Sequence, residues 1–426
     1  MNVTIAPAPL AGTVAAVASK SDAHRLLICA AFADRATGIG LSASSRDIGA
    51  TVRCLEALGA KIERMQDGLR VTPVQGAVSD PVLDCGESGS TLRFLLPVAA
   101  AVSETPVFCG TGRLPARPVS PLLDALAQRG KLVRSERFPI RLAGKLTPGS
   151  FSIPGNISSQ FVSGLLLAAP LTGGACALNL TSPLASADYA AMTLSVMRHF
   201  SVPVEDTPRG FAVEPRAYRS PGRADAEGDW SSAAFWLAAA ALGGEISVTG
   251  LPENSLQPDR RILELLQAYG ARLDARGGTL LCRAGEHRAF DFNTDASPDL
   301  APVLCVLAAA AAGRSRIRGI ARLRGKESNR VAACTALVRA LGGEIEVQNE
   351  SFVIEGKPTL SGGTVDAMGD HRIAMAAAAA STACTGPLRI IGAQAAEKSY
   401  PRFFKDFETL GGSINVEGKD DSHERH

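Results

Sequence analysis

With 426 residues, the chain exceeds the usual size of one domain and predicts two domains of about 210 residues each. Its 44 basic and 42 acidic side chains leave a formal charge of +2, which argues against nucleic acid or an anionic membrane as a partner. The nine cysteines have no metal-ligand spacing and are typical of free thiols in a reducing cytoplasm. We therefore expect a cytoplasmic protein with no metal, no cofactor and no membrane-spanning helix.

The two ends of the chain predict different structures. The first 20 residues are apolar, but they lack a basic start and contain Pro7 and Pro9, which argues against a signal peptide. We expect an edge strand in this segment. The polar tail, residues 418–426, is expected to be disordered.

Six Ala- and Leu-rich segments recur along the chain at intervals of 68 to 71 residues. Each is apolar on nearly every side after a polar first turn, which is typical of a helix in a protein core. These segments begin near Ser21, Gly89, Ser159, Trp230, Asp299 and Asp370.

A second series of six amphipathic helices alternates with the first, and each ends in a turn followed by a short β-branched run. Five of the six turn residues are glycine, which can cap a helix in the left-handed conformation. The turn residues are Gly59, Gly130, Ser201, Gly270, Gly342 and Gly411. The sequence therefore predicts six repeats of about 70 residues, three in each domain.

Basic side chains are concentrated at the starts of these helices, where the helix dipole disfavours positive charge. An anionic ligand would supply the missing partner, since helix starts also offer free backbone N–H groups. We therefore expect a small, multiply anionic ligand in a cationic cleft between the domains. The basic residues concerned are Lys20, Arg25, Arg93, Lys326, Arg330 and Arg372.

Each polar residue at a helix start also has a simpler interpretation. Taken singly, four of them are more typical of N-caps than of ligand contacts: Ser21, Ser90, Ser159 and Asp370. Asp299 and Glu327 lie near basic residues and are either counter-ions or a general acid and base. His371 is either a packed core histidine or a catalytic one, and its charged neighbours favour the second.

Nine motifs between about residues 15 and 405 resemble those of the enolpyruvyl transferases, in the order found in that family. They are SKSDAHR (19–25), GESGSTLR (86–93), GRLPARP (112–118), SSQF (158–161), SADY (186–189), PD (298–299), GKESNR (325–330), DHRIAM (370–375) and EKSYP (397–401). The resemblance implies an α/β protein of two lobes, each with three βαβαββ units, in an inside-out α/β barrel. One lobe would comprise residues 1–18 and 228–426, and the other residues 19–227.

Within that family, the chain looks most similar to the members whose acceptor is shikimate 3-phosphate. The resemblance implies transfer of the enolpyruvyl group of phosphoenolpyruvate to the acceptor's 5-hydroxyl through a tetrahedral intermediate, with release of phosphate. The product would be 5-enolpyruvylshikimate 3-phosphate, an intermediate of chorismate and aromatic amino-acid biosynthesis. A cytoplasmic monomer acting on these two small molecules is expected.

The motifs also imply roles for individual residues. The catalytic set would be Lys20, Asp299, Glu327 and His371. The shikimate 3-phosphate set would be Lys20, Ser21, Arg25, Ser158, Ser159, Gln160, Ser186, Asp299 and Lys326. The phosphoenolpyruvate set would be Lys20, Gly89, Arg113, Gln160, Arg330, Arg372 and Lys398.

The chain departs from the family pattern at three positions. His24 stands where the family commonly has Asn, and Arg322 stands where it often has Asn. Glu87-Ser88-Gly89 replaces the frequent Asn-Ala-Gly. Neither Glu87 nor Arg322 is therefore assigned to the site. Two alternatives stay open. One is transfer to a UDP-N-acetylglucosamine acceptor, which Ser21 and the Gly112–Pro115 loop disfavour, and the other is a non-catalytic paralogue that binds phosphorylated metabolites.

Overall fold

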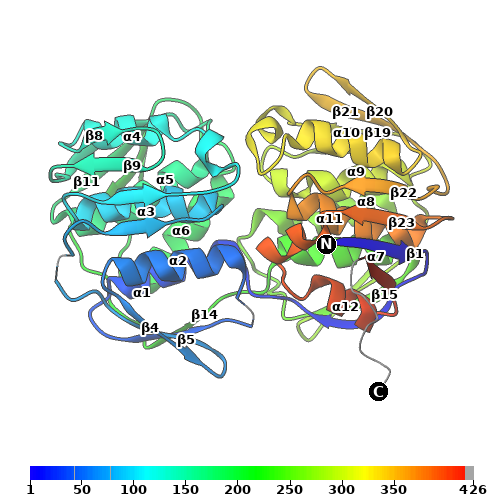
Figure 1. The fold of residues 1–426 in the computed structure, drawn as a ribbon, viewed down its shortest axis with the longest axis horizontal. Helices are drawn as coiled ribbons and strands as arrows, with labels where there is room; N and C mark the ends of the chain where they lie inside the picture. The colour runs from blue at the N-terminus through cyan, green and yellow to red at the C-terminus, as the bar shows by residue number, and fades with distance from the viewer. Residues whose placement is uncertain (43, 77, 418–426) are drawn as a thin grey trace. The chain divides into compact units, whose positions relative to one another are not determined.

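The computed structural model describes residues 1–42, 44–76 and 78–417, and the tail predicted to be disordered lies outside them. The chain divides into two compact units. Unit 1 comprises Met1–Ala16, Gly228–Ser255 and the chain from Asp259 onward, and unit 2 comprises Val17–Glu227 with the short segment Leu256–Pro258. Figure 1 shows that each unit is built from helices and small sheets.

Unit 2 contains three four-stranded sheets within the described residues. In sheet order they are β14 (Arg223–Asp225), β3 (Thr37–Gly40), β5 (Gly68–Thr72) and β4 (Lys61–Met65); β6 (Val82–Asp84), β7 (Val107–Cys109), β9 (Ile140–Ala143) and β8 (Leu132–Ser135); and β10 (Gly149–Ile153), β11 (Cys176–Leu180), β13 (Gly210–Val213) and β12 (Glu205–Thr207). Its α-helices are α1 (Lys20–Ala31), α2 (Arg46–Ala57), α3 (Gly89–Val102), α4 (Ser120–Ala127), α5 (Ser159–Ala168) and α6 (Ala187–His199).

Unit 1 repeats this plan over the part of it that the structure describes. Its sheets are β2 (Ala11–Ala15), β15 (Glu245–Thr249), β17 (Thr279–Arg283) and β16 (Arg272–Arg276); β18 (Asp291–Asn293), β19 (Gly313–Arg318), β21 (Ser351–Gly356) and β20 (Glu344–Gln348); and β22 (Gly363–Asp366), β23 (Leu388–Ile391), β1 (Asn2–Ala6) and β24 (Ser413–Glu417). Its α-helices are α7 (Trp230–Gly243), α8 (Ile262–Tyr269), α9 (Ala301–Ala309), α10 (Arg330–Ala340), α11 (His371–Ala380) and α12 (Phe403–Thr409).

Every one of these sheets has the same strand pattern. The first strand pairs in parallel with the second, and the third and fourth follow in antiparallel order, as in β10, β11, β13 and β12. A parallel pair needs a crossover connection, and in four of the six sheets a helix lies between the two parallel strands, as α5 does between β10 and β11. In the other two sheets, β14 and β2 pair in parallel with strands from a distant part of the chain. The six repeats predicted from the sequence are therefore present.

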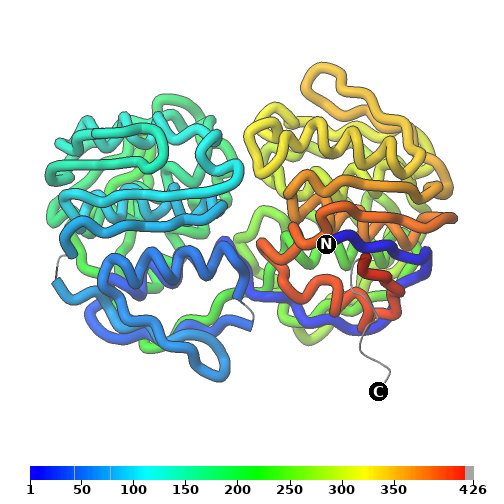
Figure 2. The backbone as a smooth tube through the Cα atoms, in the orientation of Figure 1, coloured from blue at the N-terminus to red at the C-terminus, as the bar shows by residue number. Residues whose placement is uncertain are grey.

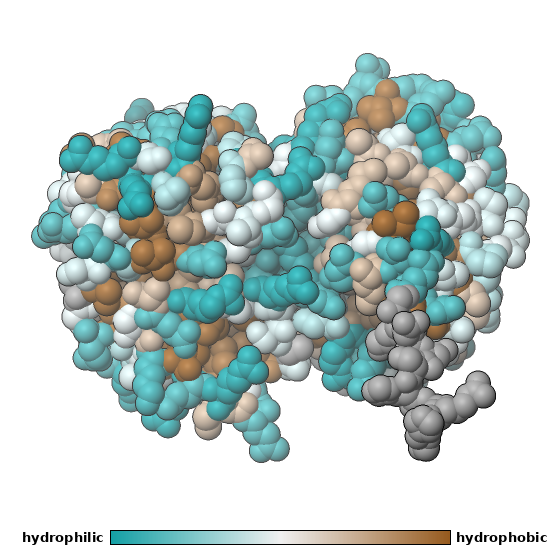
Figure 3. Space-filling model, in the orientation of Figure 1, coloured by the Kyte–Doolittle hydropathy of each residue, from teal (hydrophilic) through white to brown (hydrophobic). Residues whose placement is uncertain are grey.

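The first helix series forms the core of each unit. Every residue of α9 and of α11 is buried, as expected for helices that are apolar on all sides. The second series is amphipathic: α2, for example, buries Ile48, Thr51 and Leu55, which are spaced three and four residues apart. Hydrophilic and apolar residues are interspersed on the face shown in Figure 3. The large exposed apolar side chains include Met65 and Val82.

All six turn residues predicted to end the second series have a positive φ. The five glycines lie between 79° and 100°, and Ser201 has φ 65°. Left-handed backbone is costly for a residue with a Cβ, so Ser201 keeps the turn of the other repeats at some cost in conformational energy.

Several details of the sequence-based expectations are wrong. The N-terminal segment forms two strands, and β1 lies inside its sheet between β23 and β24, as Figure 2 shows, while only β2 is an edge strand. The N-caps at the starts of α1, α3 and α5 are Ser19, Ser88 and Ser158, one or two residues before the serines proposed for this role. Asp370 does cap α11.

No helix in the described residues is long and apolar enough to cross a membrane.

Candidate functional site

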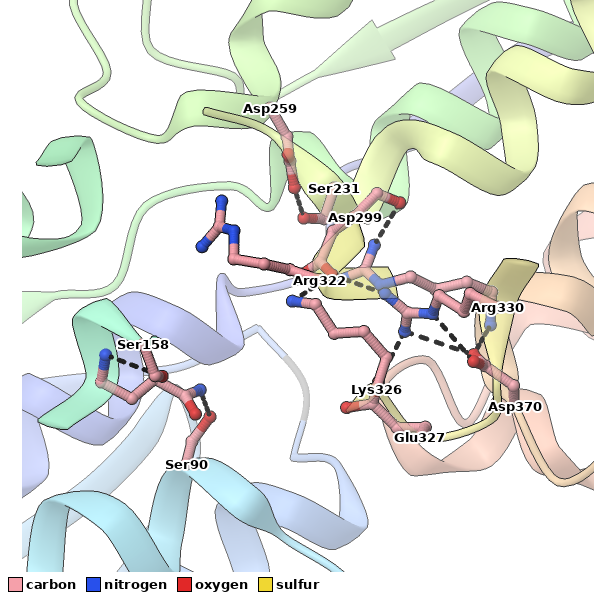
Figure 4. A network of polar contacts seen from close by, with 12 residues as sticks. Ser90, Ser158, Ser231, Asp259, Asp299, Arg322, Lys326, Glu327, Arg330 and Asp370 are labelled. Atoms are coloured by element: carbon pink, nitrogen blue, oxygen red, sulfur yellow. Dashed lines mark hydrogen bonds and ion pairs between the residues drawn. The ribbon is translucent and has the colours of Figure 1, made fainter. Parts of the chain in front are cut away.

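Arg330 is the centre of a charged cluster in unit 1 (Figure 4). It is the first residue of α10, and its side chain is only 1% exposed. Its Nη1 donates to Asp299 Oδ1 at 2.7 Å, its Nη2 to Glu327 Oε2 at 2.7 Å and its Nε to Asp370 Oδ2 at 2.8 Å. Burial opposes its charge, but the three carboxylates outweigh burial and raise the pKa of Arg330 well above its usual value.

Asp299 binds two further cations of unit 1. It lies on the short 3₁₀ helix η4 (Pro298–Leu300), which precedes α9. Arg372 Nη2 donates to Asp299 Oδ2 at 2.9 Å, and Lys326 Nζ lies 3.4 Å from Oδ1. Burial would raise the pKa of Asp299, but Arg372, Lys326 and Arg330 together hold it well below its usual value. In this arrangement Asp299 is ionised and is a weak base.

Asp370 is the third carboxylate that Arg330 contacts. It is fully buried, and it accepts hydrogen bonds from Ser328 Oγ at 2.9 Å and from the Arg372 backbone N–H at 3.0 Å, in addition to Arg330. Burial opposes its ionisation, yet the Arg330 charge keeps the pKa of Asp370 below its usual value. The adjacent His371 is 1% exposed, and its Nδ1 lies 3.8 Å from Asp370 Oδ1.

A further acid of unit 1, Asp259, was not predicted from the sequence. It lies on η3 (Pro258–Arg261), is 2% exposed, and its Oδ2 accepts a hydrogen bond from Ser231 Oγ (Figure 4). Burial and the nearby negative charge of Asp299 raise the pKa of Asp259 to about 7.

Unit 2 holds a second set of the predicted residues, around the start of α1. Lys20 Nζ donates to Asp47 Oδ2 at 2.9 Å. Arg25 is fully buried, donates from Nε to Thr193 Oγ1 at 2.7 Å, and also bonds to the carbonyl oxygen of Ser21. Burial lowers the pKa of Arg25 to about 10, so it remains charged at neutral pH.

Gln160 links α5 to α3 within unit 2. Its Nε2 donates to Ser90 Oγ at 2.9 Å, and its Oε1 accepts from Arg93 Nη1 at 2.8 Å. Ser158, the N-cap of α5, accepts from the Gln160 backbone N–H at 3.3 Å. Ser159 is buried in the first turn of the same helix.

The remaining predicted residues lie at helix ends. Gly89 begins α3, and a Cβ there would lie 2.4 Å from Arg117 Nη1, so a larger residue would require the Arg117 side chain to move. Arg113 is exposed at the start of η1 (Leu114–Ala116), and Ser186 precedes α6 in the left-handed conformation. Lys398, partly buried, ends η7 (Ala393–Lys398).

The three departures from the family pattern have different surroundings. His24 is buried, and its Nδ1 lies 2.8 Å from Thr51 Oγ1; burial lowers the pKa of His24 to about 3. Glu87 is exposed, and its carboxylate lies against Gly112. Arg322 donates to the carbonyl oxygen of Asp295 and appears beside the unit 1 cluster in Figure 4.

The structure corrects one step of the sequence argument. Basic residues do begin several helices, but Lys20, Arg330 and Arg372 already contact carboxylates of the protein, so their positions alone do not require an external anion. Asp299 and Glu327 were already considered as counter-ions, but the partner of Lys20 was not recognised, because Asp47 lies 27 residues away and no local pattern joins the two.

Comparison with known proteins shows a clear relationship. A family sequence model described as EPSP synthase (3-phosphoshikimate 1-carboxyvinyltransferase) matches residues 5–407. The 3-phosphoshikimate 1-carboxyvinyltransferase of Clostridium kluyveri is 38% identical over 417 residues, covering 97% of this chain and 98% of its own. That of Methanocorpusculum labreanum is 35% identical over 424 residues, covering 98% of this chain and all of its own.

Solved structures give the fold. An EPSP synthase from Acinetobacter baumannii has a TM-score of 0.81 at 23% identity, covering 97% of this chain and 100% of its own. The enolpyruvyl transferase NikO from Streptomyces tendae has a TM-score of 0.79 at 20% identity, covering 97% and 98%. The predicted fold class, a two-lobed α/β enolpyruvyl transferase fold with six repeats, is confirmed.

Proposed function

The chain belongs to the EPSP synthase (3-phosphoshikimate 1-carboxyvinyltransferase) family, and from this membership we propose that it transfers the enolpyruvyl group of phosphoenolpyruvate to the 5-hydroxyl of shikimate 3-phosphate. The products are 5-enolpyruvylshikimate 3-phosphate and phosphate, and the reaction serves aromatic amino-acid biosynthesis. The observation that carries the proposal is the match over nearly the whole chain, together with the unit 1 cluster of Asp299, Glu327 and their cations.

The proposed chemistry proceeds by addition and elimination. A base removes the proton of the 5-hydroxyl while an acid protonates the methylene carbon of the donor, which gives a tetrahedral intermediate. Loss of phosphate, with a proton returned by the base and one removed from the methyl group, then restores the double bond. Both substrates carry a phosphate and a carboxylate, so cations must hold the ligands and balance the developing charge.

Asp299 and Glu327 are proposed as the base that faces the 5-hydroxyl and the acid that protonates carbon. Arg330 binds both carboxylates with opposite Nη atoms, each at 2.7 Å, and thereby fixes their spacing. The low pKa of Asp299 comes from cations that ligand anions would also attract. A ligand that draws Arg372 or Lys326 away would raise the pKa of Asp299 and make it a stronger base.

The shikimate 3-phosphate contacts are proposed for the following residues, taken unit by unit. In unit 2, the caps and first turns at the starts of α1, α5 and α6 would provide hydroxyl groups and backbone N–H groups for the phosphate and carboxylate. These residues are Ser21, Arg25, Ser158, Ser159, Gln160 and Ser186. Lys20 would lie between the two substrates, and Lys326 and Asp299 would contribute from unit 1.

Phosphoenolpyruvate is proposed to contact Lys20, Gly89, Arg113, Gln160, Arg330, Arg372 and Lys398. Gly89 is buried in the first turn of α3 and lies against the Arg117 guanidinium, so an anion at this helix start would also meet a cation. Arg330 already donates to three carboxylates, from its Nε and both Nη atoms, so the donor would share this guanidinium with them. His371 is proposed to assist through hydrogen bonding.

Release of phosphate from phosphoenolpyruvate tests the function. We expect release with shikimate 3-phosphate and none with UDP-N-acetylglucosamine. Release only with the UDP-sugar would favour the sister activity, and binding of either ligand without release would favour a non-catalytic paralogue. Light scattering tests the further proposal of a 44.2 kDa monomer, and fractionation of the native cell tests the cytoplasmic location.

A further inference from the structure

Asp259 is a buried acid that the proposed mechanism does not use. It is 2% exposed, and its Oδ2 accepts a hydrogen bond from Ser231 Oγ. Its Oδ1 is buried and accepts no hydrogen bond from the described residues. A buried carboxylate oxygen without a donor is costly when the group is ionised, which favours the neutral carboxyl.

Three charged groups act on Asp259. Asp299 and Asp229 are negative and disfavour its ionisation, whereas Arg372 is positive and favours it. Burial is the largest effect, and the net result is a pKa of about 7 for Asp259. Arg372 meanwhile donates to Asp299 Oδ2 at 2.9 Å and, more weakly, to the Asp299 carbonyl oxygen at 3.5 Å. Arg372 therefore bonds to one acid and interacts electrostatically with the other.

We propose, on the basis of the proposed function, that Asp259 is a positioning residue for the reaction: its neutral carboxyl leaves Arg372 to Asp299 and the donor, whereas its carboxylate competes with them for the same guanidinium. Ser231 holds the Asp259 side chain in place through Oδ2. The phosphate and carboxylate of phosphoenolpyruvate are the anions that would share Arg372. Ionisation of Asp259 would thus weaken donor binding without removing any group that touches the substrates.

The expected direction follows from proton linkage. An anionic donor at Arg372 adds negative charge near Asp259 and withdraws positive charge, and both effects raise the pKa of Asp259. Donor binding is then coupled to proton uptake, so the KM for phosphoenolpyruvate should rise with pH through neutrality. A shift of half a pKa unit corresponds to about a threefold rise in KM.

Three proteins should be compared: wild type, Asp259→Asn and the control Tyr269→Phe. The Asn side chain keeps the shape of the neutral acid and the bond from Ser231 but cannot ionise. Tyr269→Phe removes another buried oxygen of the same chain segment, the Tyr269 hydroxyl, which has no hydrogen-bond partner among the described residues and titrates far above neutrality. Steady-state kinetics at saturating shikimate 3-phosphate from pH 6 to 9 give KM and kcat separately.

We expect the KM of Asp259→Asn to rise less steeply with pH than that of wild type and of Tyr269→Phe, with kcat changed less than KM. The donor phosphate also titrates near pH 6, but it does so equally in all three proteins. The same pH dependence of KM in wild type and Asp259→Asn would overturn the inference. Absence of phosphate release by wild type would instead overturn the proposed function.

If Asp259→Asn is inactive, thermal unfolding without ligands still tests the titration. A folded-state pKa near 7 means that wild type loses stability relative to Asp259→Asn as pH rises from about 4 to 7. A constant difference in Tm over this range would show that Asp259 does not titrate there and would overturn the inference.

Discussion

Three carboxylates share the guanidinium of Arg330, and this sharing explains how a buried cluster of acids remains ionised. Pairing inside a protein barely repays the desolvation of the ions, but loss of one partner leaves an uncompensated charge and costs about 3–5 kcal/mol. The cluster is therefore sensitive to any change of its central cation. Arg330 holds the carboxylates of Asp299 and Glu327 at a fixed spacing, which suits the two residues that are proposed to act as base and acid.

At this scale, Asp299→Asn and Glu327→Gln should each lower kcat by a factor of about 10² to 10⁴, because each removes a proposed proton-transfer group. Substrate affinity, measured by calorimetry, should change far less. Asp291→Asn is the matched control, since it removes an exposed carboxylate of unit 1 that pairs with the exposed Arg318 at 2.7 Å. A loss of affinity as large as the loss of kcat would show that the two acids are counter-ions.

His24 predicts acid sensitivity. Its folded-state pKa of about 3 lies below the usual 6.5, so between these values His24 is protonated in the unfolded chain and neutral in the folded chain. The stability of the folded protein therefore falls as the pH drops below about 6.5. His24→Asn removes the titrating group and should reduce this loss by about 2 kcal/mol at pH 5. Tm values at pH 7.5 and pH 5 measure the effect, and an equal loss of Tm in both proteins would contradict it.

Among the elements, the close packing of α3 against α5 positions Gln160 beside Ser90 and Arg93. Gly164 on α5 makes this possible, because a Cβ at that position would lie 2.2 Å from the Arg93 carbonyl oxygen and 3.0 Å from Pro97 Cγ. The small residue therefore sets the distance between the two helices. The polar contacts of Gln160 depend on that distance.

Gly164→Ala should force α3 and α5 apart and destabilise the protein by about 1–3 kcal/mol. Gly49→Ala is the matched control, since Gly49 also lies within a helix but a Cβ there would meet only the flexible Arg53 side chain, at 3.6 Å. That change should stabilise α2 by up to about 1 kcal/mol. Chemical denaturation compares the two variants, and equal stability would refute the packing argument.

The elements were easier to predict than their contacts. The period of about 70 residues located both helix series and all six turns, because burial and left-handed turns each leave a local pattern in the sequence. The position of β1 inside its sheet could not be predicted from the sequence around it, because the strands that pair with β1 begin only at Leu388. For the same reason the pairs Lys20–Asp47 and Arg330–Asp370 were missed, while resemblance to the family pointed to Asp299 and Glu327.

In the whole molecule, each unit is completed by chain from a distant part of the sequence. In unit 1, Val3 and Ile5 of β1 are fully buried, and the strand pairs with three residues of β23 and five of β24. In unit 2, β14 pairs in parallel with β3, almost 190 residues earlier in the chain. Each unit therefore depends on contacts with high sequence separation.

Deletion of residues 1–6 should leave β23 and β24 without their shared partner. Hydrogen exchange should then be at least tenfold faster at the amides of these two strands, whereas β11 of unit 2 should keep its protection. A synthetic peptide of residues 1–8 added to the shortened protein should restore the slow exchange. Unchanged exchange at β24 after the deletion would mean that β1 does not hold this sheet together.

The position of β1 also has a consequence for synthesis on the ribosome. β1 pairs with β24, so once β1 has emerged it must wait for about 400 further residues, or about 20–80 s at ordinary translation rates. Unit 2 lies almost entirely between these two strands and can complete its sheets during this interval. A nascent chain therefore carries an apolar, unpaired strand while a finished neighbour is already folded, which makes Val3 and Ile5 a target for chaperones.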